Sequence, residues 1–427
     1  MSIDKKYDVA VIGAGPAGMM AAISAGKSGA NVVLIEKNQS AGKKLLLTGG
    51  GRCNLANAEF DLRKLIANYG KSGTFLFHSF SEFGPKEVME FFNGLGIKTK
   101  LENNGRMFPK SDKAQDVLNV LIKWLDESDV ETMYDSKVVD IEKENGEIAK
   151  IVLGNGDNIV AKNYVIATGG KSYSGTGSTG DGYEWAAVLG HKINELSPEL
   201  APIKVQEAWI KDLAGISLKR AQISILQNNK KMVSVCGELL FTHFGVSGPA
   251  ILNISGDIGK LLKNGPVEIL LDLLSRTEFA VLEKMILAEF TKNPNRILKN
   301  CLNDFVPEGL ALAVANVVGI NPSKTVNDIT KEERRHLVSA MKNFKLAVAG
   351  LLSIESGMIT GGGVELSEID HKTMRSKIVS NLFFAGEIVN VHGPTGGFNL
   401  LQCWSTGMLA GKSAANRKPL TKYNKCD

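Results

Sequence analysis

The segment from Tyr7 to Glu36 constrains the fold of this chain more than any other part of the sequence. An apolar run, Val9 to Ile12, stops at three glycines spaced as Gly-x-Gly-x-x-Gly. Residues 19–30 are mostly small and helix-forming, and a second apolar run, 31–35, ends in Glu36. Strand, glycine turn, helix, strand and acid follow in the order of a βαβ unit that binds a dinucleotide.

Each part of the glycine turn has a physical role. Gly13 permits the tight turn, Gly15 lets the backbone approach a pyrophosphate, and Gly18 lets helix and strand pack closely. Pro16 suits the first helical turn, and the N–H groups at the start of the helix favour a phosphate. Glu36 lies where a carboxylate would hold ribose hydroxyls. The sequence therefore predicts one set of nucleotide-binding residues: Gly13, Ala14, Gly15, Pro16, Ala17, Gly18, Glu36 and Lys37.

Composition and charge exclude several other classes of protein. The chain has 427 residues, of which 44% are hydrophobic and 22% charged, as in soluble globular proteins of two or three domains. A net charge of +5 and a few short basic pairs predict solvated surface and no nucleic-acid partner. No apolar run approaches the roughly 18 residues of a membrane span. The five cysteines form no CxxC pair, so we expect no metal site and a cytoplasmic protein.

Changes of pattern along the chain predict four segments. Helical and strand patterns alternate in residues 1–193, as in doubly wound folds. Prolines and short β-rich runs in residues 194–275 indicate a β-barrel-like insert, and residues 276–345 turn helical. Strand and glycine signals return in residues 346–427. We therefore predict an α/β fold in which a Rossmann-like domain, made of the first and last segments, is interrupted by a barrel insert and a helical insert.

Single elements of the first segment are also legible. Residues 83–95, 113–128 and 181–191 have the periodicity of helices. Residues 136–141 and 148–153 alternate as two strands, and the Asn-Gly pair between them favours a hairpin. We expect the backbone of Val138 or Val139, at the start of this hairpin, to contact an adenine ring.

A second motif, Lys44 to Asn54, contains three consecutive glycines. Glycines at 49–51 strip side chains from the backbone and expose N–H groups to a ligand, although a flexible surface loop is the alternative. Arg52 could neutralise a pyrophosphate, and Asn54 could donate and accept toward a polar ring edge. Cys53 has no second cysteine five residues on, where Ala58 stands, so we expect packing and no dithiol chemistry.

Two further motifs end apolar strands. Tyr164 begins a strand that ends in Thr168, Gly169 and Gly170. Residues 381–385 form another, which delivers Glu387 after Gly386, where a carboxylate could hold a ribityl hydroxyl. The following turn, 395–399, precedes a predicted helix over 400–410. Its N-terminus could face a ring edge that becomes negative on reduction.

These four motifs, in this order, resemble one family. The chain is similar to the NAD(P)/FAD-dependent oxidoreductase family of conserved flavoproteins, which includes aminoacetone oxidase-like and bile-acid enone reductase-like enzymes. The similarity extends from about Tyr7 to Gly411 and includes residues 105–109, 237–249 and 357–363. It implies a Rossmann-like FAD domain with barrel and helical inserts. The sequence departs from the pattern at 390–395, where an acidic residue and an aromatic are expected.

The resemblance implies non-covalently bound FAD, with NAD(P)H as a possible transient electron donor. Together with the motifs it predicts the remaining cofactor-binding residues: Lys44, Gly50, Gly51, Arg52, Cys53, Asn54, Val138, Val139, Thr168, Gly169, Gly170, Gly386, Glu387, Gly396, Gly397, Phe398 and Asn399. Residues 175–180 also read Gly-x-Gly-x-x-Gly, but they do not directly follow a strand. We therefore expect no separate Rossmann unit for NAD(P).

The predicted function is hydride transfer between the flavin N5 and a small organic substrate. Two enzymatic hypotheses compete: an NAD(P)H-driven reductase of a conjugated C=C bond (an enone), and an oxidase that passes electrons from an amine or amino ketone to O₂. A flavin-binding protein without turnover is the third. His392 is a candidate proton donor, although a loop histidine held by backbone is the alternative. His243 could border the substrate cavity. The sequence predicts no oligomeric state.

Overall fold

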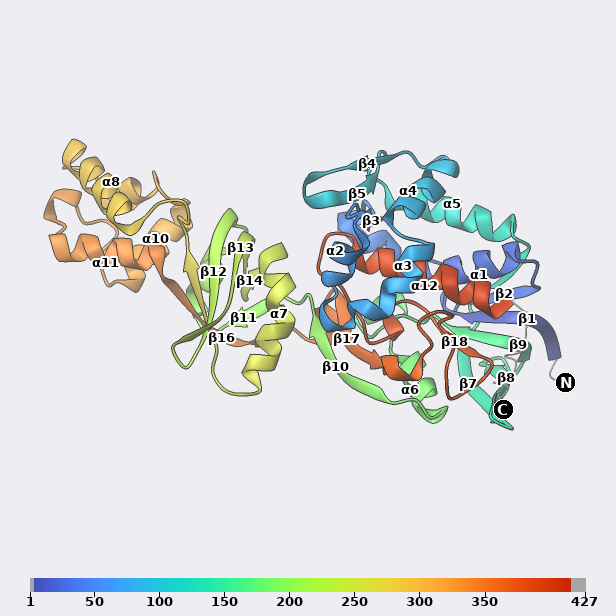
Figure 1. Cartoon of the computed structure of the whole chain (residues 1–427). Coiled ribbons are helices and arrows are strands. Elements are labelled where there is room, and N and C mark those ends of the chain that lie inside the picture. The colour runs from blue at the N-terminus through green and yellow to red at the C-terminus, as the bar shows by residue number, and fades with distance from the viewer. Residues whose placement is uncertain (1–3, 416–427) are drawn as a thin grey trace, which may run out of the picture. The chain divides into compact units, whose positions relative to one another are not determined.

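The chain forms two compact bodies in a computed structural model that describes residues 4–415 (Figure 1). The first body comprises the described residues up to Ser197 and those from Ile359 onward. The second comprises Pro198–Met358. The Rossmann-like α/β fold with a barrel and helices is therefore confirmed.

The first body is built on a seven-stranded sheet with the order β6-β2-β1-β9-β8-β7, to which β18 adds by pairing with β9. The strands β6, β2, β1, β9 and β18 run parallel, whereas β8 and β7 are antiparallel to their neighbours. Parallel strands are buried on both faces, which explains the unbroken apolar runs. The bounds are Asp4–Ile12 (β1), Val32–Ile35 (β2), Val130–Met133 (β6), Val138–Glu144 (β7), Glu147–Leu153 (β8), Asn158–Ile166 (β9) and Leu382–Phe384 (β18).

Two helices from opposite ends of the sequence cross closely on this sheet. They are α1 (Pro16–Lys27) and α12 (Phe398–Ala415). A Cβ at Gly407 would lie 2.3 Å from the Ala17 carbonyl oxygen, and one at Gly411 would lie 2.0 Å from that of Ala21. The small residues of both helices thus allow backbone to touch backbone.

The predicted local elements of the first segment are confirmed with shifted ends. Helix α4 (Pro85–Gly94), α5 (Ala114–Asp126) and α6 (Asp181–Val188) form where the periodicity predicts them. The turn between β7 and β8 holds Asn145 and Gly146 at φ of 51° and 84°, as a two-residue hairpin requires. The remaining elements of this part are Ala56–Asn57 (β3), Thr99–Leu101 (β4), Arg106–Pro109 (β5), Leu62–Ala67 (α2) and Phe77–Glu82 (α3).

The second body contains a closed barrel with the strand order β11-β14-β13-β12-β15-β16. Its strands are Ile203–Val205 (β11), Ser217–Gln227 (β12), Lys230–Thr242 (β13), Gly245–Ser247 (β14), Glu268–Asp272 (β15) and Phe344–Leu351 (β16). Its helices are Pro249–Leu262 (α7), Phe279–Lys292 (α8), Leu298–Leu302 (α9), Glu308–Val317 (α10) and Lys331–Lys342 (α11). One apolar core joins the barrel and these helices.

The boundaries of the inserts differ from those expected at 194 and 346. Strand β16 contains residue 346 and closes the barrel by pairing with both β11 and β15, so the barrel continues after the helical segment. Strand β10 (Ile193–Glu199) pairs with β17 (Ile359–Val364) across the inserted chain. Local pattern identifies a strand but not its distant partner, so the sequence alone does not show that β16 belongs to the barrel. Within residues 4–415 no helix is both long and apolar enough to cross a membrane.

Candidate functional site

The glycine turn after β1 contains three glycines. Close packing requires two of them to be glycine, but not the third. Gly13 has φ of 101°, and a Cβ there would lie 2.8 Å from the Ala167 carbonyl oxygen. A Cβ at Gly18 would lie 1.8 Å from the Gly13 carbonyl oxygen. At Gly15, by contrast, φ is −80° and nothing lies within 4 Å of a built Cβ. The fold therefore leaves open space at Gly15, beside the N-terminus of α1, and this space fits a pyrophosphate.

Glu36 is buried at the end of β2 and is held by three N–H groups. Its Oε2 accepts from Ala14 N at 2.9 Å, and its Oε1 accepts from Asn38 N at 2.9 Å and Asn38 Nδ2 at 2.7 Å. A carboxylate oxygen has about two acceptor sites, so Oε1 is filled and Oε2 retains one. That site fits a ribose hydroxyl. Lys37 instead donates to Asp181 at 2.8 Å, so its charge is compensated.

The strand expected to contact adenine begins with an irregularity. The pairing of β7 with β8 shifts between Val138 and Asp140, which takes Val139 out of the regular ladder. Val138 is buried, whereas Val139 is half exposed. The backbone of Glu36 lies nearby, since its carbonyl accepts from Ser136 N at 2.9 Å. An adenine contact through Val138 or Val139 remains a prediction that this arrangement permits.

Glu387 lies in a short turn after β18, in a polar cluster assembled from distant parts of the chain. Its Oε2 accepts from Lys44 Nζ at 2.8 Å. Its Oε1 accepts from Thr360 N at 2.8 Å and Ser172 Oγ at 3.1 Å. A Cβ at Gly170 would lie 2.7 Å from Oε1. The structure thus brings together Lys44, Gly170 and Glu387, three of the predicted residues, and leaves one acceptor site on Oε2 for a ligand hydroxyl.

Gly386 fixes this carboxylate close to the glycine turn. It has φ of 79°, and a Cβ there would lie 2.6 Å from Cβ of Ala17 in the first turn of α1. Its N–H donates to Thr406 Oγ1 of α12 at 3.0 Å. Only glycine satisfies both the left-handed backbone and this close approach. The fold therefore places both the Glu387 turn and the open space at Gly15 near the start of α1.

The three-glycine loop turns sharply. Four of its residues have positive φ: Gly49, Gly50, Gly51 and Cys53. Arg52 stacks on the Phe108 ring at 3.9 Å and donates to both oxygens of Glu102, at 2.9 and 3.1 Å. It also pairs with Asp112 at 3.1 Å. Its charge is thus matched by carboxylates, so Arg52 anchors the loop to β5, and its contact with a pyrophosphate remains a prediction.

Cys53 is fully buried, and burial raises the pKa of its thiol to about 12. A thiol that holds its proton so tightly does not act as a nucleophile near neutral pH. Two other atoms in predicted residues, Asn54 Oδ1 and Thr168 Oγ1, are buried without a hydrogen-bond partner among the described residues. Because buried polar atoms are normally hydrogen-bonded, these two fit a site that a polar ligand completes.

The turn before α12 is held by its own side chains. Asn399 Oδ1 accepts from Gly393 N at 2.9 Å, and Asn399 Nδ2 donates to the Gly393 carbonyl at 2.9 Å. A Cβ at Gly397 would lie 2.3 Å from the Ala56 carbonyl oxygen. Tyr69 Oη donates to the Phe398 carbonyl at 2.8 Å. The Asn399 amide is therefore used to clamp the loop, and its contact with a cofactor remains a prediction.

Asn57, on β3, connects this turn to the turn between β4 and β5. Its Nδ2 donates to the Gly396 carbonyl at 3.1 Å and to the Asn104 carbonyl at 3.0 Å. Sequence reasoning missed Asn57, Tyr69 and Ser172, since single polar residues outside glycine motifs gave no signal. Thr360 lies in the motif 357–363, which the resemblance included without a role for this residue.

The two candidate histidines differ in setting. His392 is half-buried in the loop before Gly393, whose N–H is held by Asn399. His243 is exposed at the two-residue turn between β13 and β14 of the second body, where it packs against Phe244. The structure keeps His392 in the first body, which also holds the Glu387 cluster.

The second Gly-x-Gly-x-x-Gly sequence, 175–180, is not part of a second βαβ unit. The helix that follows it, α6, leads to β10, which pairs with β17 and not with the central sheet. The loop lies against the end of β2, where Asn38 Nδ2 donates to the Thr176 carbonyl at 3.1 Å. Gly177 packs against this loop contact, since a Cβ there would lie 2.4 Å from Asn38 Nδ2, whereas nothing lies within 4 Å of a Cβ at Gly175.

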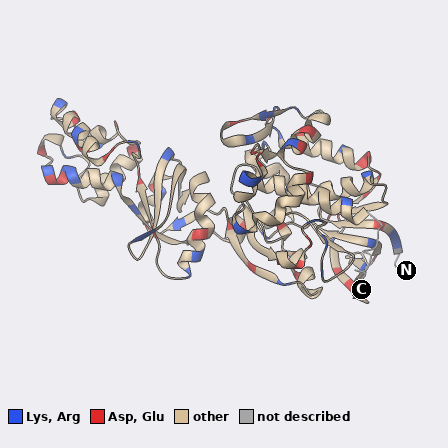
Figure 2. Cartoon of the chain, viewed as in Figure 1, with Lys and Arg blue, Asp and Glu red and all other residues tan. Residues whose placement is uncertain are grey.

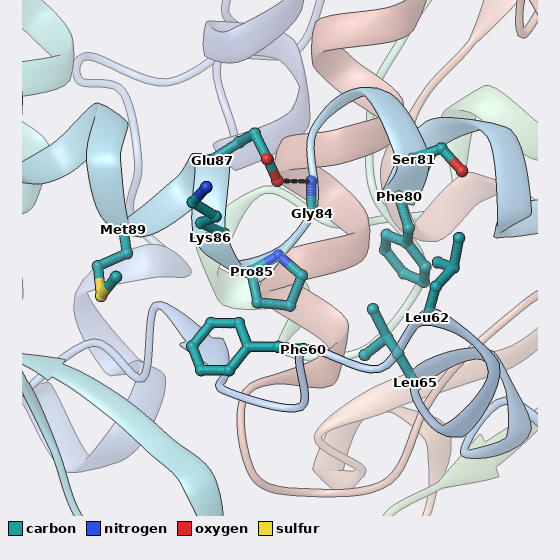
Figure 3. A pocket seen from close by; sticks show the side chains of 10 residues that line it. All are labelled: Phe60, Leu62, Leu65, Phe80, Ser81, Gly84, Pro85, Lys86, Glu87 and Met89. Atoms are coloured by element: carbon teal, nitrogen blue, oxygen red, sulfur yellow. Dashed lines mark hydrogen bonds between the residues drawn. The ribbon is translucent and has the colours of Figure 1, made fainter.

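A separate hollow of about 450 Å³ lies on the first body over α2, α3 and α4 (Figure 3). Its polar group Glu87 accepts from Gly84 N at 3.0 Å and so caps α4. The lining is mostly apolar: Phe60, Leu62, Leu65, Phe80, Pro85 and Met89, with Ser81, Gly84, Lys86 and Glu87. No predicted site residue lines this hollow.

Known proteins of similar sequence cover nearly the whole chain. The 3-dehydro-bile acid delta(4,6)-reductase of Clostridium scindens is 30% identical over 412 residues, which cover 96% of this chain and 99% of that protein. The ribosomal RNA dihydrouridine synthase of Escherichia coli is 27% identical over 418 residues, covering 96% and 100%. The synthase of the same name from Haemophilus influenzae is 28% identical over 416 residues.

Solved structures share the fold at lower identity. An open conformation of a flavocytochrome c3 fumarate reductase has a TM-score of 0.53 at 18% identity and covers 96% of this chain and 78% of its own. The 3-ketosteroid-delta4-(5alpha)-dehydrogenase of Rhodococcus jostii RHA1 has a TM-score of 0.51 at 15% identity, covering 96% and 97%. The HI0933-like protein Rossmann domain family matches residues 7–413. The sequence-based identification is thereby confirmed, and the chain belongs to the HI0933-like family of Rossmann flavoproteins.

Proposed function

We propose that this chain is a reductase that binds FAD non-covalently and saturates a C=C bond conjugated with a carbonyl group, with NAD(P)H as electron donor. The observation that supports this most is full-length similarity to relatives whose names describe such a reaction on two different molecules. One is named for reducing a bile acid. The others are named for making dihydrouridine, which is uridine with its C5=C6 bond saturated.

The residues of the first body suit each part of FAD. The open space at Gly15 and the N–H groups of α1 would receive the pyrophosphate. Glu36 would hold the adenosine ribose, and Glu387 a ribityl hydroxyl, each through the acceptor site left on its Oε2. The backbone N–H groups at Gly396, Gly397 and the start of α12 would face the pyrimidine edge of the ring and favour negative charge there. FAD, when bound, supplies the hydride chemistry at its N5 position.

Reduction of a conjugated C=C bond also requires a proton at the carbon beside the carbonyl. His392 is our candidate donor, because it is half-buried on the loop that the Asn399 clamp fixes before α12. An imidazole can hold a proton near neutral pH and release it to a carbanion-like centre.

We propose a small organic substrate in preference to RNA. Figure 2 shows Lys and Arg interspersed with Asp and Glu along both bodies. The basic pair Arg334 and Arg335 contacts Glu283, at 3.7 and 3.2 Å. Nucleic-acid surfaces instead gather uncompensated basic side chains along a track. Uridine in ribosomal RNA is the second candidate substrate, on the strength of the two synthases that match 95–96% of the chain.

The compartment we propose is the cytoplasm. Four described cysteines, at 53, 236, 301 and 403, carry free thiols. Thiols persist where glutathione and thioredoxin keep the medium reducing. NAD(P)H, the donor in our proposal, is a cytoplasmic metabolite.

The test is the visible spectrum of the purified protein under anaerobic conditions, before and after addition of NADPH or NADH. Flavin bands that bleach with either nucleotide support the reductase, and recovery of the bands on adding an enone steroid or uridine-containing ribosomal RNA then distinguishes the two substrates. Bands that persist with NAD(P)H but bleach with an amine or amino ketone, and return with O₂, support the oxidase. Bands that no donor bleaches support a flavin-binding protein without turnover. A protein that takes up no FAD contradicts the proposal.

A further inference from the structure

The motif of residues 357–363 has entered the site so far only through the N–H of Thr360, and its hydroxyl has no role yet. Its second half forms β17, and Thr360 on this strand is 2% exposed. The hydroxyl of Thr360 accepts two backbone hydrogen bonds, from Lys171 N at 2.7 Å and Ser172 N at 3.0 Å. Its own N–H donates to Glu387 Oε1 at 2.8 Å. One residue therefore holds both the turn after β9 and the carboxylate after β18.

The packing around Thr360 leaves it little freedom. A Cβ at Gly170 would lie 2.5 Å from Thr360 Oγ1, so the glycine turn after β9 is closed directly against the hydroxyl. The turn in question also carries Ser172, whose Oγ donates to Glu387 Oε1 at 3.1 Å and accepts from Lys44 Nζ at 2.8 Å. The hydroxyl of Thr360 thus determines where Ser172 meets the carboxylate.

We infer that Thr360 is a positioning residue for the cofactor and acts through Glu387. This inference rests on the proposed binding of FAD. Thr360 N and Ser172 Oγ fill Oε1, so the carboxylate is turned with Oε2 toward Lys44 and toward any ligand hydroxyl. Loss of the hydroxyl would remove the acceptor that Lys171 N and Ser172 N share, and losing these hydrogen bonds costs free energy. The turn would move to satisfy them, and Ser172 would leave the carboxylate.

The inference is tested with Thr360→Val, which keeps the shape of the side chain and removes the hydroxyl. Thr360→Ser keeps the hydroxyl and is the conservative rescue. Glu387→Gln and the double variant Thr360→Val/Glu387→Gln complete a double-mutant cycle. Ser255→Ala is the matched control, because Ser255 Oγ is a buried hydroxyl that accepts a backbone N–H, that of Ala201 at 3.0 Å, in the other body.

The measurements are the Kd for FAD on deflavinated protein, the visible spectrum of bound flavin and the thermal midpoint. We expect Thr360→Val to raise Kd about tenfold or more, Thr360→Ser to stay within about threefold, and Ser255→Ala to lower the midpoint without changing Kd. In the Glu387→Gln background, Thr360→Val should add less than about threefold, because residues of one hydrogen-bonded network are not additive.

Two results would overturn the inference while leaving FAD binding intact: a wild-type Kd in Thr360→Val, or full additivity with Glu387→Gln. Wild-type protein that binds no FAD would instead refute the proposed function, and the inference with it. If Thr360→Val does not fold, Ser172→Ala takes its place in the cycle, since it removes the hydroxyl that Thr360 delivers to Glu387.

Discussion

Lys44 Nζ lies 2.8 Å from Glu387 Oε2, and their side chains are 21% and 16% exposed. The pair joins the loop after β2 to the turn after β18, two segments separated by most of the chain. Removing the cation leaves a partly buried carboxylate without a compensating charge. This costs more free energy than the intact pair contributes to stability. The pair is therefore a sensitive point of the proposed FAD site.

Replacement of Lys44 by Met should weaken FAD binding by about tenfold or more, since Glu387 would be left with an uncompensated charge. The double variant Lys44→Met/Glu387→Gln should recover part of this loss, because the amide needs no cation. Kd is measured by titration of deflavinated protein with FAD. Equal loss in the single and double variants would contradict the prediction.

Substitutions in the turn at Gly13–Gly18 can test FAD binding and the stability of the fold separately. Gly15→Ala places a methyl group in the open space and should abolish measurable FAD binding, while its cost to stability is at most about 1 kcal/mol, from the helix N-cap. Gly18→Ala should destabilise the fold by about 3 kcal/mol or more, because its Cβ meets the Gly13 carbonyl oxygen at 1.8 Å.

The matched control for Gly15 is Gly94→Ala. Gly94 is an exposed glycine at the end of α4 with nothing within 4 Å of a built Cβ, and its replacement should leave Kd unchanged. Thermal midpoints and FAD titrations of all three variants decide the matter. Retention of wild-type affinity by Gly15→Ala would place the pyrophosphate elsewhere.

Substitutions at Arg52 and Glu102 test whether Arg52 anchors the three-glycine loop or contacts the pyrophosphate. If Arg52 anchors the three-glycine loop through Glu102, then Arg52→Met and Glu102→Gln should raise Kd for FAD to a similar extent, roughly threefold to tenfold. If it contacts the pyrophosphate, only Arg52→Met should do so, and the affinity of the wild type should fall more steeply with salt than that of the variant. Titration at two ionic strengths separates the two roles.

We expect Glu199 to make the stability of the fold depend on pH. Burial raises the pKa of its carboxyl from 4.5 to about 7, with Lys260 opposing the rise and Asp257 adding to it. The folded state then holds the proton more tightly than the unfolded state. The contribution is present below pH about 4.5 and is lost as pH rises to about 7, by up to about 3 kcal/mol.

Glu199→Gln should remove that dependence. We expect the thermal midpoint of the variant, relative to wild type, to rise steadily between pH 4.5 and 7 and to level off above it. Calorimetry at four pH values across this window is sufficient. Parallel curves for the two proteins would show that Glu199 does not titrate there.

His392 is tested through proton delivery. His392→Gln keeps a polar side chain that cannot supply a proton, so kcat for reduction of an enone should fall by about 10²- to 10⁴-fold, the range typical of general acids. Bleaching of the flavin by NAD(P)H should be unaffected, since that step needs no proton from His392. Equal kcat for the two proteins would reject this role.

Local chemistry explains which features were predictable from the sequence. The turn at Gly13–Gly18 and the hairpin at Asn145–Gly146 follow from backbone conformations that few residues can adopt. The glycine before Glu387 is legible for the same reason. These features are written within a few consecutive residues, and the structure has each of them where the pattern indicates.

Features that depend on distant partners could not be predicted from the sequence. Strand β16 looks like any strand, and only its pairing with β11 and β15 assigns it to the barrel. Ser172 and Asn57 acquire their roles from groups that arrive from far along the chain. Arg52 was predicted to neutralise a pyrophosphate, and no sequence pattern paired it with Glu102 and Asp112, which lie on either side of the motif 105–109.

The crossing of α1 and α12 also has a consequence for biosynthesis. The ribosome makes the glycine turn and α1 first, whereas Gly386, Glu387 and the glycines of α12 emerge only after the whole inserted body. Until then α12 does not cover the small-residue face of α1, and the Glu387 side of the proposed FAD site is missing. If the proposed function holds, flavin loading would follow translation of nearly the entire chain, and we expect a truncated chain that ends before α12 to bind no FAD.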